Sequence, residues 1–317
     1  MGWRTWRAAM TGALYGPGGF YARGEAPAGH FRTSVHASPL FAGALAELAG
    51  RAGLRTVVDV GAGRGELLCQ LHALDPDLAL HGVDVLPRPE RLPAAITWTD
   101  RQPAVGPALV VANEWLDNVP LDVVVAAGGR LRLVLVDEHG AERFGPAPDP
   151  ADRAWLDQWW PGAPRAEVGR SRDAAWAGTL ERLATGVAVA VDYAHLLAGR
   201  PAGGTLAGYR NGRQVRPVPD GSCDLTAHLA ADSCAAAGRA AGATDTLLLT
   251  QRDALHRLGV RGTPPPVGTA GTDPTGYLRG LERASQAAEL TDPSGLGGFT
   301  WLVQTIGAIG WPIPLGE

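Results

Sequence analysis

The chain has 317 residues, of which 45% are hydrophobic, and its formal net charge is −4 at pH 7. This size and composition allow one large core or two modest ones. Because the sequence holds no basic run, a nucleic-acid partner is not expected, and no apolar run reaches the roughly twenty residues of a membrane-spanning helix. The three cysteines are too few and too irregularly spaced for a disulfide framework or a zinc site, which favours a cytoplasmic protein without a metal.

The first 52 residues are predicted to form a helical extension that includes a lid. Apolar residues recur at helical spacing in Pro39–Arg51 and form one face, which is typical of a helix packed on a core. The residues of that face are Leu40, Phe41, Ala44, Leu45 and Leu48. Thr33 and Ser34 precede this helix and are expected to close over a bound ligand, although Ser34 or Ser38 could equally cap a helix.

The most informative segment is a buried strand that leads through a glycine turn into a helix. Thr56–Val60 is rich in β-branched residues, as in a parallel strand covered on both faces, and leucines at helical spacing begin at Leu67. The glycines of Gly61–Gly65 let the backbone turn sharply and approach a ligand. A second strand ends at Asp84, whose carboxylate could bind both hydroxyls of a ribose. The pattern predicts an adenosine cofactor, unless the glycines form only a tight turn.

The residue at the third position of the glycine motif distinguishes between two adenosine cofactors. The dinucleotide pattern G-x-G-x-x-G would require a glycine where Glu66 stands, and a carboxylate there would face two phosphate charges. S-adenosylmethionine has no phosphate and carries a sulfonium cation, so that Asp59 and Glu66 are tolerable or helpful. We therefore favour S-adenosylmethionine over a nicotinamide cofactor.

Polar residues follow two further predicted strands. The strand 95–98 leads to Asp100, whose carboxylate could accept a hydrogen bond from the adenine amino group, with Trp98 stacked nearby. The apolar strand Ala108–Ala112 ends in a polar run. This run contains Asn113, Glu114, Trp115, Asp117 and Asn118. Ligands of open parallel sheets lie beyond such carboxyl ends, so the run is expected at the ligand site.

The part of the chain from 53 to 317 is predicted to be a sheet-centred core with an insertion at about 121–185. Within the insertion, Gly128-Gly129 is expected to form a hairpin turn. A tryptophan-rich surface segment and a helix from Arg172 to Ala184 are expected to follow it.

Acceptor-side elements are expected at about 199–290. They include a helix over Leu225–Gly238 that Asp224 would cap. Asp192 and Tyr193 end a strand over Val187–Val191, where they could complete an acceptor pocket or only fix a loop, and His228 is expected to be structural.

Several separated segments resemble one known family in their order and approximate spacing. They are Ala13–Tyr21, Gly29–Ser34, the glycine turn with Arg64-Gly65, Asn113–Pro120, Val191–Tyr193, Gly204–Arg210 and Asp224–His228. Together they resemble the MidA-like methyltransferase family, which includes the mitochondrial complex I assembly-factor methyltransferase. The resemblance implies an α/β fold, a Rossmann-like class I methyltransferase sheet with helices on both faces. It also implies S-adenosylmethionine as the cofactor and methylation of a protein arginine.

The sequence departs from this family at three positions and in one segment. His30 stands where the family usually has aspartate, Asn211 where it often has a basic residue, and Asn118 where alanine is typical. The proline-rich stretch after Asp84 is expected to replace a helix by a loop. The expected cofactor-binding residues are Thr33, Ser34, Asp59, Gly61, Ala62, Gly63, Asp84, Val85, Asp100 and Asn113.

A guanidinium acceptor would need carboxylates that orient it and offset its charge. Glu114 and Asp117, together with Asn113, are the expected catalytic residues. If the turn after their strand is helical, a spacing of three residues places both carboxylates on one face. Alternatively, Asp117 caps a helix and Glu114 is only solvated.

Two other functions remain compatible with the sequence. The first is a methyltransferase of the same fold that acts on a small molecule, and the second is a catalytically silent assembly factor that binds S-adenosylmethionine. The expected partner is thus an arginine-containing protein or a small-molecule acceptor, and the sequence also allows a homodimer.

Overall fold

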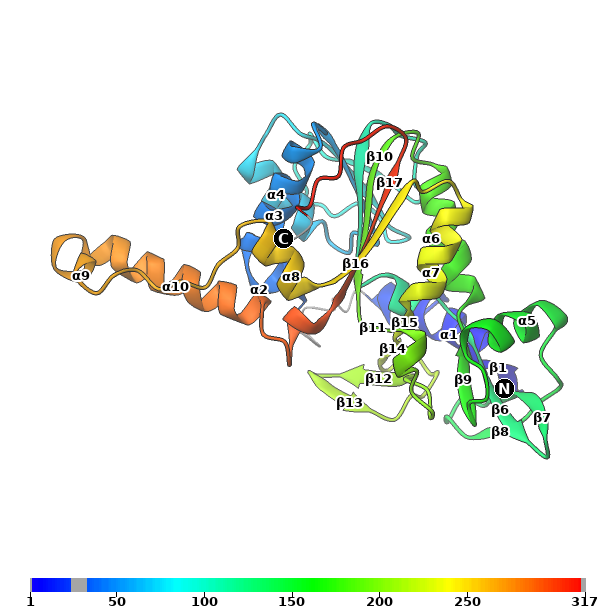
Figure 1. Ribbon diagram of the computed structural model, residues 1–317. Coiled ribbons are helices and arrows are strands. Elements are labelled where there is room, and N and C mark those ends of the chain that lie inside the picture. Colours follow the sequence, from blue (N-terminus) through cyan, green and yellow to red (C-terminus); the bar gives the residue numbers. More distant parts are fainter. Residues whose placement is uncertain (1, 24–32, 315–317) are drawn as a thin grey trace.

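The structure is a computed structural model that describes residues 2–23 and 33–314. A seven-stranded sheet in the order β16-β17-β10-β5-β2-β3-β4 forms its centre (Figure 1). The strands are β2 (Thr56–Val60), β3 (Ala79–Val83), β4 (Thr97–Thr99), β5 (Ala108–Asn113), β10 (Gly186–Asp192), β16 (Asp245–Thr250) and β17 (Thr300–Ile306). All neighbours pair in parallel except β17, which is antiparallel to both β10 and β16.

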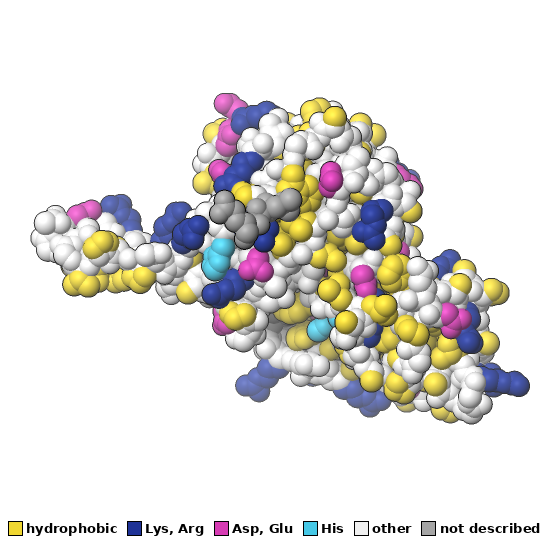
Figure 2. All heavy atoms as spheres, in the orientation of Figure 1, with side chains coloured by type: hydrophobic (Ala, Val, Ile, Leu, Met, Phe, Trp, Pro, Cys, Tyr) yellow, Lys and Arg dark blue, Asp and Glu magenta, His cyan; other side chains and the backbone are white. Residues whose placement is uncertain are grey.

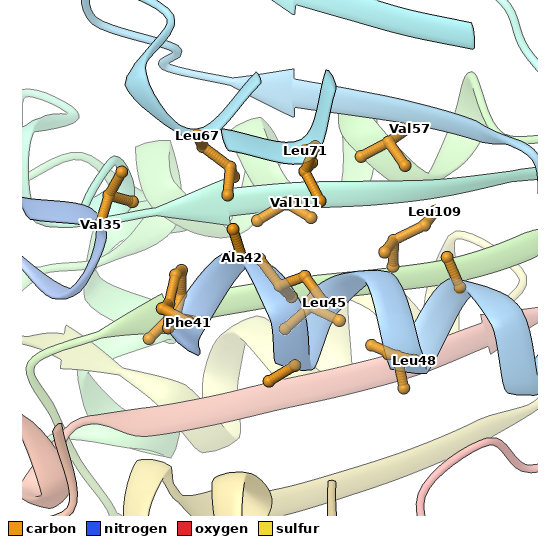
Figure 3. Close-up of a cluster of buried hydrophobic side chains, with 14 of the residues drawn as sticks. Val35, Phe41, Ala42, Leu45, Leu48, Val57, Leu67, Leu71, Leu109 and Val111 are labelled. Atoms are coloured by element: carbon orange, nitrogen blue, oxygen red, sulfur yellow. The ribbon is translucent and has the colours of Figure 1, made fainter. Parts of the chain in front are cut away.

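Helices cover both faces of this sheet (Figure 1). On one face lie α3 (Pro39–Arg51), α4 (Glu66–Leu74), α8 (Gln251–Arg257) and the end of α10 (Pro274–Leu290); on the other lie α6 (Arg170–Glu181) and α7 (Ala231–Ala240). Figure 3 shows Phe41, Leu45 and Leu48 of α3 in one buried cluster with Leu109 and Val111 of the sheet. This arrangement confirms the predicted Rossmann-like sheet with helices on both faces.

The helix predicted over Pro39–Arg51 is confirmed with the same bounds, and it begins where two local signals coincide. Ser38 caps it, because its hydroxyl accepts a hydrogen bond from the backbone N–H of Leu40 at 3.0 Å. Pro39 occupies the first helical position, where the missing N–H has no cost.

A second sheet packs beside the carboxyl edge of the first. Its strands are β1 (Arg4–Thr5), β6 (Asp122–Ala127), β7 (Arg130–Val136), β8 (Glu142–Phe144) and β9 (Arg165–Val168). The predicted hairpin turn is present, since Gly128 and Gly129 have φ values of 56° and 73° between β6 and β7. The N-terminal helix α1 (Trp6–Tyr15) packs on this sheet through Trp6 and Met10. Helix α5 (Pro150–Trp159) packs there through Trp155, which is buried.

Small elements complete the carboxyl side. They are η1 (Tyr21–Arg23), α2 (Ser34–Ala37), η3 (Leu116–Asn118), β11 (Ala194–His195), η4 (Leu197–Gly199), β12 (Ala207–Arg210), β13 (Arg213–Val215), β14 (Asp224–Thr226), β15 (Leu229–Ala230) and η5 (Leu296–Gly298). The short helix α9 (Thr269–Thr272) lies instead at the outer end of α10 (Figure 1). The helix predicted over Leu225–Gly238 was wrong over residues 225–230, because β14 pairs with β12 and β15 pairs with β11 before α7 begins at Ala231. Asp224 therefore lies in a strand and caps no helix.

Three smaller expectations can be compared with the structure. The stretch from Asp84 to Ile96 contains no helix, as its prolines predicted. The third parallel strand begins two residues later than expected, at Thr97, and α6 begins at Arg170. Within residues 2–23 and 33–314, no helix is both long and apolar enough to cross a bilayer.

The first residue of β10 is predicted to be intolerant of any side chain. A Cβ on Gly186 would lie 1.9 Å from the carbonyl oxygen of Ala108 on β5, and its φ of 143° disfavours other residues. We expect Gly186→Ala to lower the free energy of unfolding by about 3 kcal/mol, measured by denaturant titration. Gly178→Ala is the control, because its Cβ would meet open space on α6 and should stabilise the helix. Equal stability of the two variants would contradict the prediction.

Candidate functional site

The glycine turn lies at the carboxyl end of β2 and has a left-handed backbone. Gly61, Gly63 and Gly65 have φ values of 74°, 58° and 78°. A Cβ on Gly61 would lie 2.6 Å from the indole of Trp115, so the close approach of that ring also requires glycine. The turn leaves backbone groups facing a cavity at the carboxyl edge.

A cavity of about 320 Å³ lies beside this turn. The predicted residues that line it are Gly61, Gly63, Asp84, Val85, Asp100 and Glu114. The carboxylate of Asp84 is held in place because it accepts hydrogen bonds from the backbone N–H groups of Gly63 at 2.8 Å and Leu86 at 2.9 Å. Each of its oxygens keeps a free lone pair, and this geometry is compatible with the expected contact to both ribose hydroxyls.

A smaller cavity of about 90 Å³ lies on the other side of the turn. The predicted residues that line it are Thr33, Asp59, Gly61, Ala62, Gly63, Asn113, Glu114 and Asp117. The two cavities share Gly61, Gly63 and Glu114, so a ligand with an adenosine part and an amino-acid part could extend through both. Ser34 lines neither cavity and instead binds Glu114.

The indole of Trp98, which was expected to stack beside the adenine, lies away from both cavities. The indole of Trp98 packs against Gly82 and Gly65, and its N–H donates to the carbonyl of Leu86 at 3.0 Å. A Cβ on Gly82 would lie 2.3 Å from this ring. Trp98 lines neither cavity and supports the adenosine side from behind.

The acids around the turn suit a cation and oppose a pyrophosphate. Asp59 is buried, and burial together with the charges of Asp84 and Glu66 raises its pKa to about 8. A phosphate placed here would face three carboxyls, whereas a sulfonium or ammonium group would stabilise their ionised forms. The residues present therefore fit S-adenosylmethionine.

Glu114 is placed by an unusual backbone conformation. Its φ is 51°, and its N–H donates to the carbonyl of Val191 on β10 at 2.8 Å. Its Oε1 accepts hydrogen bonds from the backbone N–H of Ser34 at 3.2 Å and the side-chain amide of Asn113 at 3.1 Å. Burial, followed by the neighbouring Asp117, raises its pKa to about 8. The condition for a shared helical face with Asp117 is not met, because Glu114 precedes η3 and has a left-handed backbone.

Asp117 lies in η3 and is 4% exposed. Its Oδ1 is buried and has no hydrogen-bond partner among the described residues, and Oδ1 of Asn113 shares this condition. Burial raises the pKa of Asp117 to about 6, although the charge of Arg172 lowers it. An acceptor oxygen without a donor is costly in a buried site, so Asp117 is suited to a ligand that supplies N–H groups.

Asp192 holds two backbone segments together at the carboxyl end of β10. Its two oxygens accept hydrogen bonds from the backbone N–H groups of Asp117 at 3.1 Å and Tyr193 at 2.9 Å. Burial and the charge of Asp117 raise its pKa well above the usual range. Of the two alternatives that the sequence left open, loop fixation describes Asp192 directly.

The sequence interpretation missed a fourth carboxyl group. Asp224 on β14 accepts hydrogen bonds from the hydroxyl of Tyr21 at 3.2 Å and the side-chain amide of Asn118 at 2.9 Å. Burial and the charge of Asp117 raise its pKa to about 7. Tyr21 and Asn118 both lie in segments that the sequence had singled out, but only the pairing of β14 with β12 brings Asp224 to them.

Tyr193 and His228 form an aromatic stack in the structure. Tyr193 is 42% exposed and its ring lies 4.1 Å from that of Phe299 and 5.5 Å from the parallel ring of His228. His228 supports Tyr193 from behind, in agreement with a structural role. The departure at Asn211 lies at the β12–β13 turn with φ of 52°, and His30 lies outside the described residues.

The chain matches a family model over residues 68–248, and the family is described as "Putative S-adenosyl-L-methionine-dependent methyltransferase". A search of the curated proteins finds no match. Among solved structures, a Burkholderia thailandensis protein bound to S-adenosyl-homocysteine is similar at 26% identity and a TM-score of 0.80, over 98% of this chain and 89% of that chain. An uncharacterized protein from the same organism is similar at 28% identity and a TM-score of 0.78, with the same coverage.

Cofactor affinity is predicted to depend on the ionisation of Asp59. Because the pKa of Asp59 is raised to about 8 without cofactor, cationic S-adenosylmethionine should bind about tenfold more tightly at pH 8 than at pH 6. Asp59→Asn should weaken binding and remove most of this pH dependence in isothermal titration calorimetry. Asp77→Asn, at an exposed position, is the control. An unchanged pH slope in Asp59→Asn would show that other groups cause it.

Proposed function

This chain belongs to the family of S-adenosylmethionine-dependent methyltransferases whose model it matches, and we propose that its acceptor is an arginine side chain of a protein. The enzyme class and the cofactor follow from the family and from the similar structure that holds S-adenosyl-homocysteine. The identity of the methyl acceptor is the proposed part, and it is inferred from the charges of the site.

The observation that carries the proposal is the crowding of carboxyl groups at the acceptor side. Glu114, Asp117, Asp192 and Asp224 are all buried or nearly so, and each has a raised pKa. The buried guanidinium of Arg172 offsets only part of this crowding, because the pKa values of Asp117 and Asp192 stay raised in spite of its charge. The cluster therefore favours a second cation, since its carboxyl groups are desolvated and face others of the same sign. A guanidinium stays charged at all physiological pH values and offers five N–H donors, which suits the unpaired oxygen of Asp117.

The chemistry needs alignment and the removal of one proton. When bound, S-adenosylmethionine supplies an electrophilic methyl group on its sulfonium. We assign to Glu114 and Asp117 the orientation of the guanidinium, so that one nitrogen faces that methyl group. As the nitrogen–carbon bond forms, the electron pair of the sulfur–carbon bond stays on sulfur and the nitrogen loses a proton. Glu114, with a pKa of about 8, is suited to accept that proton once ionised.

The resemblance to the MidA-like family supports the same acceptor class. It extends from the N-terminal aromatic segment to Asp224–His228, and these two segments meet in the hydrogen bond between Tyr21 and Asp224. The departure at Asn118 falls at this contact, where its amide binds the same carboxylate. Asn118 thus contributes to the acceptor side rather than blocking it.

The proposal predicts methylarginine as the product. We expect purified enzyme with isotope-labelled S-adenosylmethionine to transfer label to proteins of a cell extract, and peptide mass spectrometry to locate it on arginine. Heat-inactivated enzyme is the control. Label in small molecules alone would favour the alternative acceptor, and no transfer despite cofactor binding would favour a silent assembly factor.

Glu114 is predicted to act in turnover and not in cofactor binding. Glu114→Gln keeps the size of the side chain and an oxygen that accepts the same hydrogen bonds, but it removes the base. The rate of label transfer should therefore fall by about 100-fold or more. The dissociation constant for S-adenosylmethionine should change less than about twofold. In the wild type, kcat/KM should rise with pH through about 8, as Glu114 ionises. Glu181→Gln, at an exposed position on α6, is the matched control. An equal loss of affinity and turnover would assign Glu114 to binding or folding.

A further inference from the structure

Three large apolar side chains are exposed within five residues next to the acceptor side of the site. Tyr193 is 42% exposed, and Leu196 and Leu197 are each 47% exposed. We call these three residues the apolar rim. Single exposed hydrophobic residues are normal on protein surfaces, but a cluster beside a functional site marks a binding surface.

The apolar rim is continuous with the acid cluster. Asp192 accepts hydrogen bonds from the backbone of both Asp117 and Tyr193, so the rim begins one residue from the carboxyl groups. Figure 1 places β11 and β15 just beyond the carboxyl edge of the large sheet, above the β12–β13 hairpin. Figure 2 shows a hollow in this region with apolar side chains around it.

The loop that carries the rim is held in place with its leucines outward. The N–H of Leu197 donates to the carboxylate of Asp232 at 2.7 Å, and Arg200 forms an ion pair with the same carboxylate. Nε of Arg200 also donates to the carbonyl of Trp159 at 2.7 Å. The N–H of Leu229 donates to the carbonyl of Tyr193 at 2.7 Å, in the β11–β15 pair. A preformed apolar surface of this kind loses little conformational entropy when a partner binds.

We propose that the apolar rim binds apolar side chains that flank the acceptor arginine in a polypeptide, and this inference rests on the function proposed above. Residues of an extended chain are spaced about 3.3 Å apart, so those two or three positions from the arginine lie about 7–10 Å from it. The proposal places side chains at those positions on the rim, which begins at Tyr193 next to Asp192, while the guanidinium occupies the acid cluster. Such an acceptor matches the site in two respects. Its guanidinium binds the carboxyl groups, and its flanking apolar side chains pack on the rim.

The test uses two synthetic peptides and the full-length enzyme with labelled S-adenosylmethionine. Each peptide has one central arginine, with leucines two and three positions away on both sides in one peptide and serines in the other. We expect a KM about tenfold lower for the leucine peptide, with similar kcat, because binding and not chemistry gains from the flanks.

Two variants assign that preference to the apolar rim. The double variant Leu196→Ser, Leu197→Ser should lose the preference for the leucine peptide and keep its rate with the serine peptide. Leu278→Ser is the matched control, since Leu278 is 65% exposed on α10, away from the site, and should keep the preference. Thermal unfolding and cofactor affinity of the variants should equal those of the wild type.

The possible results separate this inference from the proposed function. Equal KM values for the two peptides, or a preference that survives in the double variant, would overturn the role of the rim and leave arginine methylation standing. If neither peptide receives a methyl group on arginine, and the extract contains no labelled methylarginine, both proposals fail.

Discussion

The buried guanidinium of Arg172 is the interaction on which the acceptor side of the site depends. It is 1% exposed, and its N–H groups donate to the backbone carbonyls of Asp117, Val119, Ala227 and His228. One side chain on α6 thus ties η3 to the turn between β14 and β15. Its charge lies among the acids and lowers the pKa of Asp117 and Asp192, against the opposing effect of burial. A buried cation is tolerated here because it is hydrogen-bonded throughout and surrounded by carboxyl groups.

The cofactor side depends on a different constraint, the order of the strands. The chain leaves β2 toward β3 on one side and places β5 on the other, so loops diverge at the carboxyl end of β2. Divergent loops leave a crevice at such a point, which is where open α/β sheets bind their ligands. The glycine turn fills this position, and Glu114 extends it toward the acceptor through a left-handed backbone that β10 and Ser34 hold in place. Strain of this kind persists where the surroundings fix it, as at functional sites.

The two sides meet in a shared electrostatic environment. Asp59 lies on the side proposed for the cofactor and Asp224 on the side proposed for the acceptor, and their pKa values are raised to about 8 and about 7, respectively, because each is desolvated near other acids. Binding a cation on either side stabilises ionised carboxyl groups and releases protons. The same charges that disfavour a pyrophosphate at the turn therefore favour a cationic cofactor and a cationic acceptor.

Local patterns in the sequence determined the large sheet, the turn at Gly61–Gly65 and the acid at Asp84, because strand ends, glycine turns and helical periodicity depend on neighbours in the chain. The same patterns placed Glu114 at the expected ligand site, but they left open whether the turn that carries it is helical. Tertiary structure decided which distant segments complete the acceptor side. Asp224 was predicted to cap a helix, because β14 forms only through its pairing with β12. Arg172 has no special signal in the sequence, and its role follows from the packing of α6 against η3. Long-range pairing and desolvation, which one sequence does not display, gave these residues their roles.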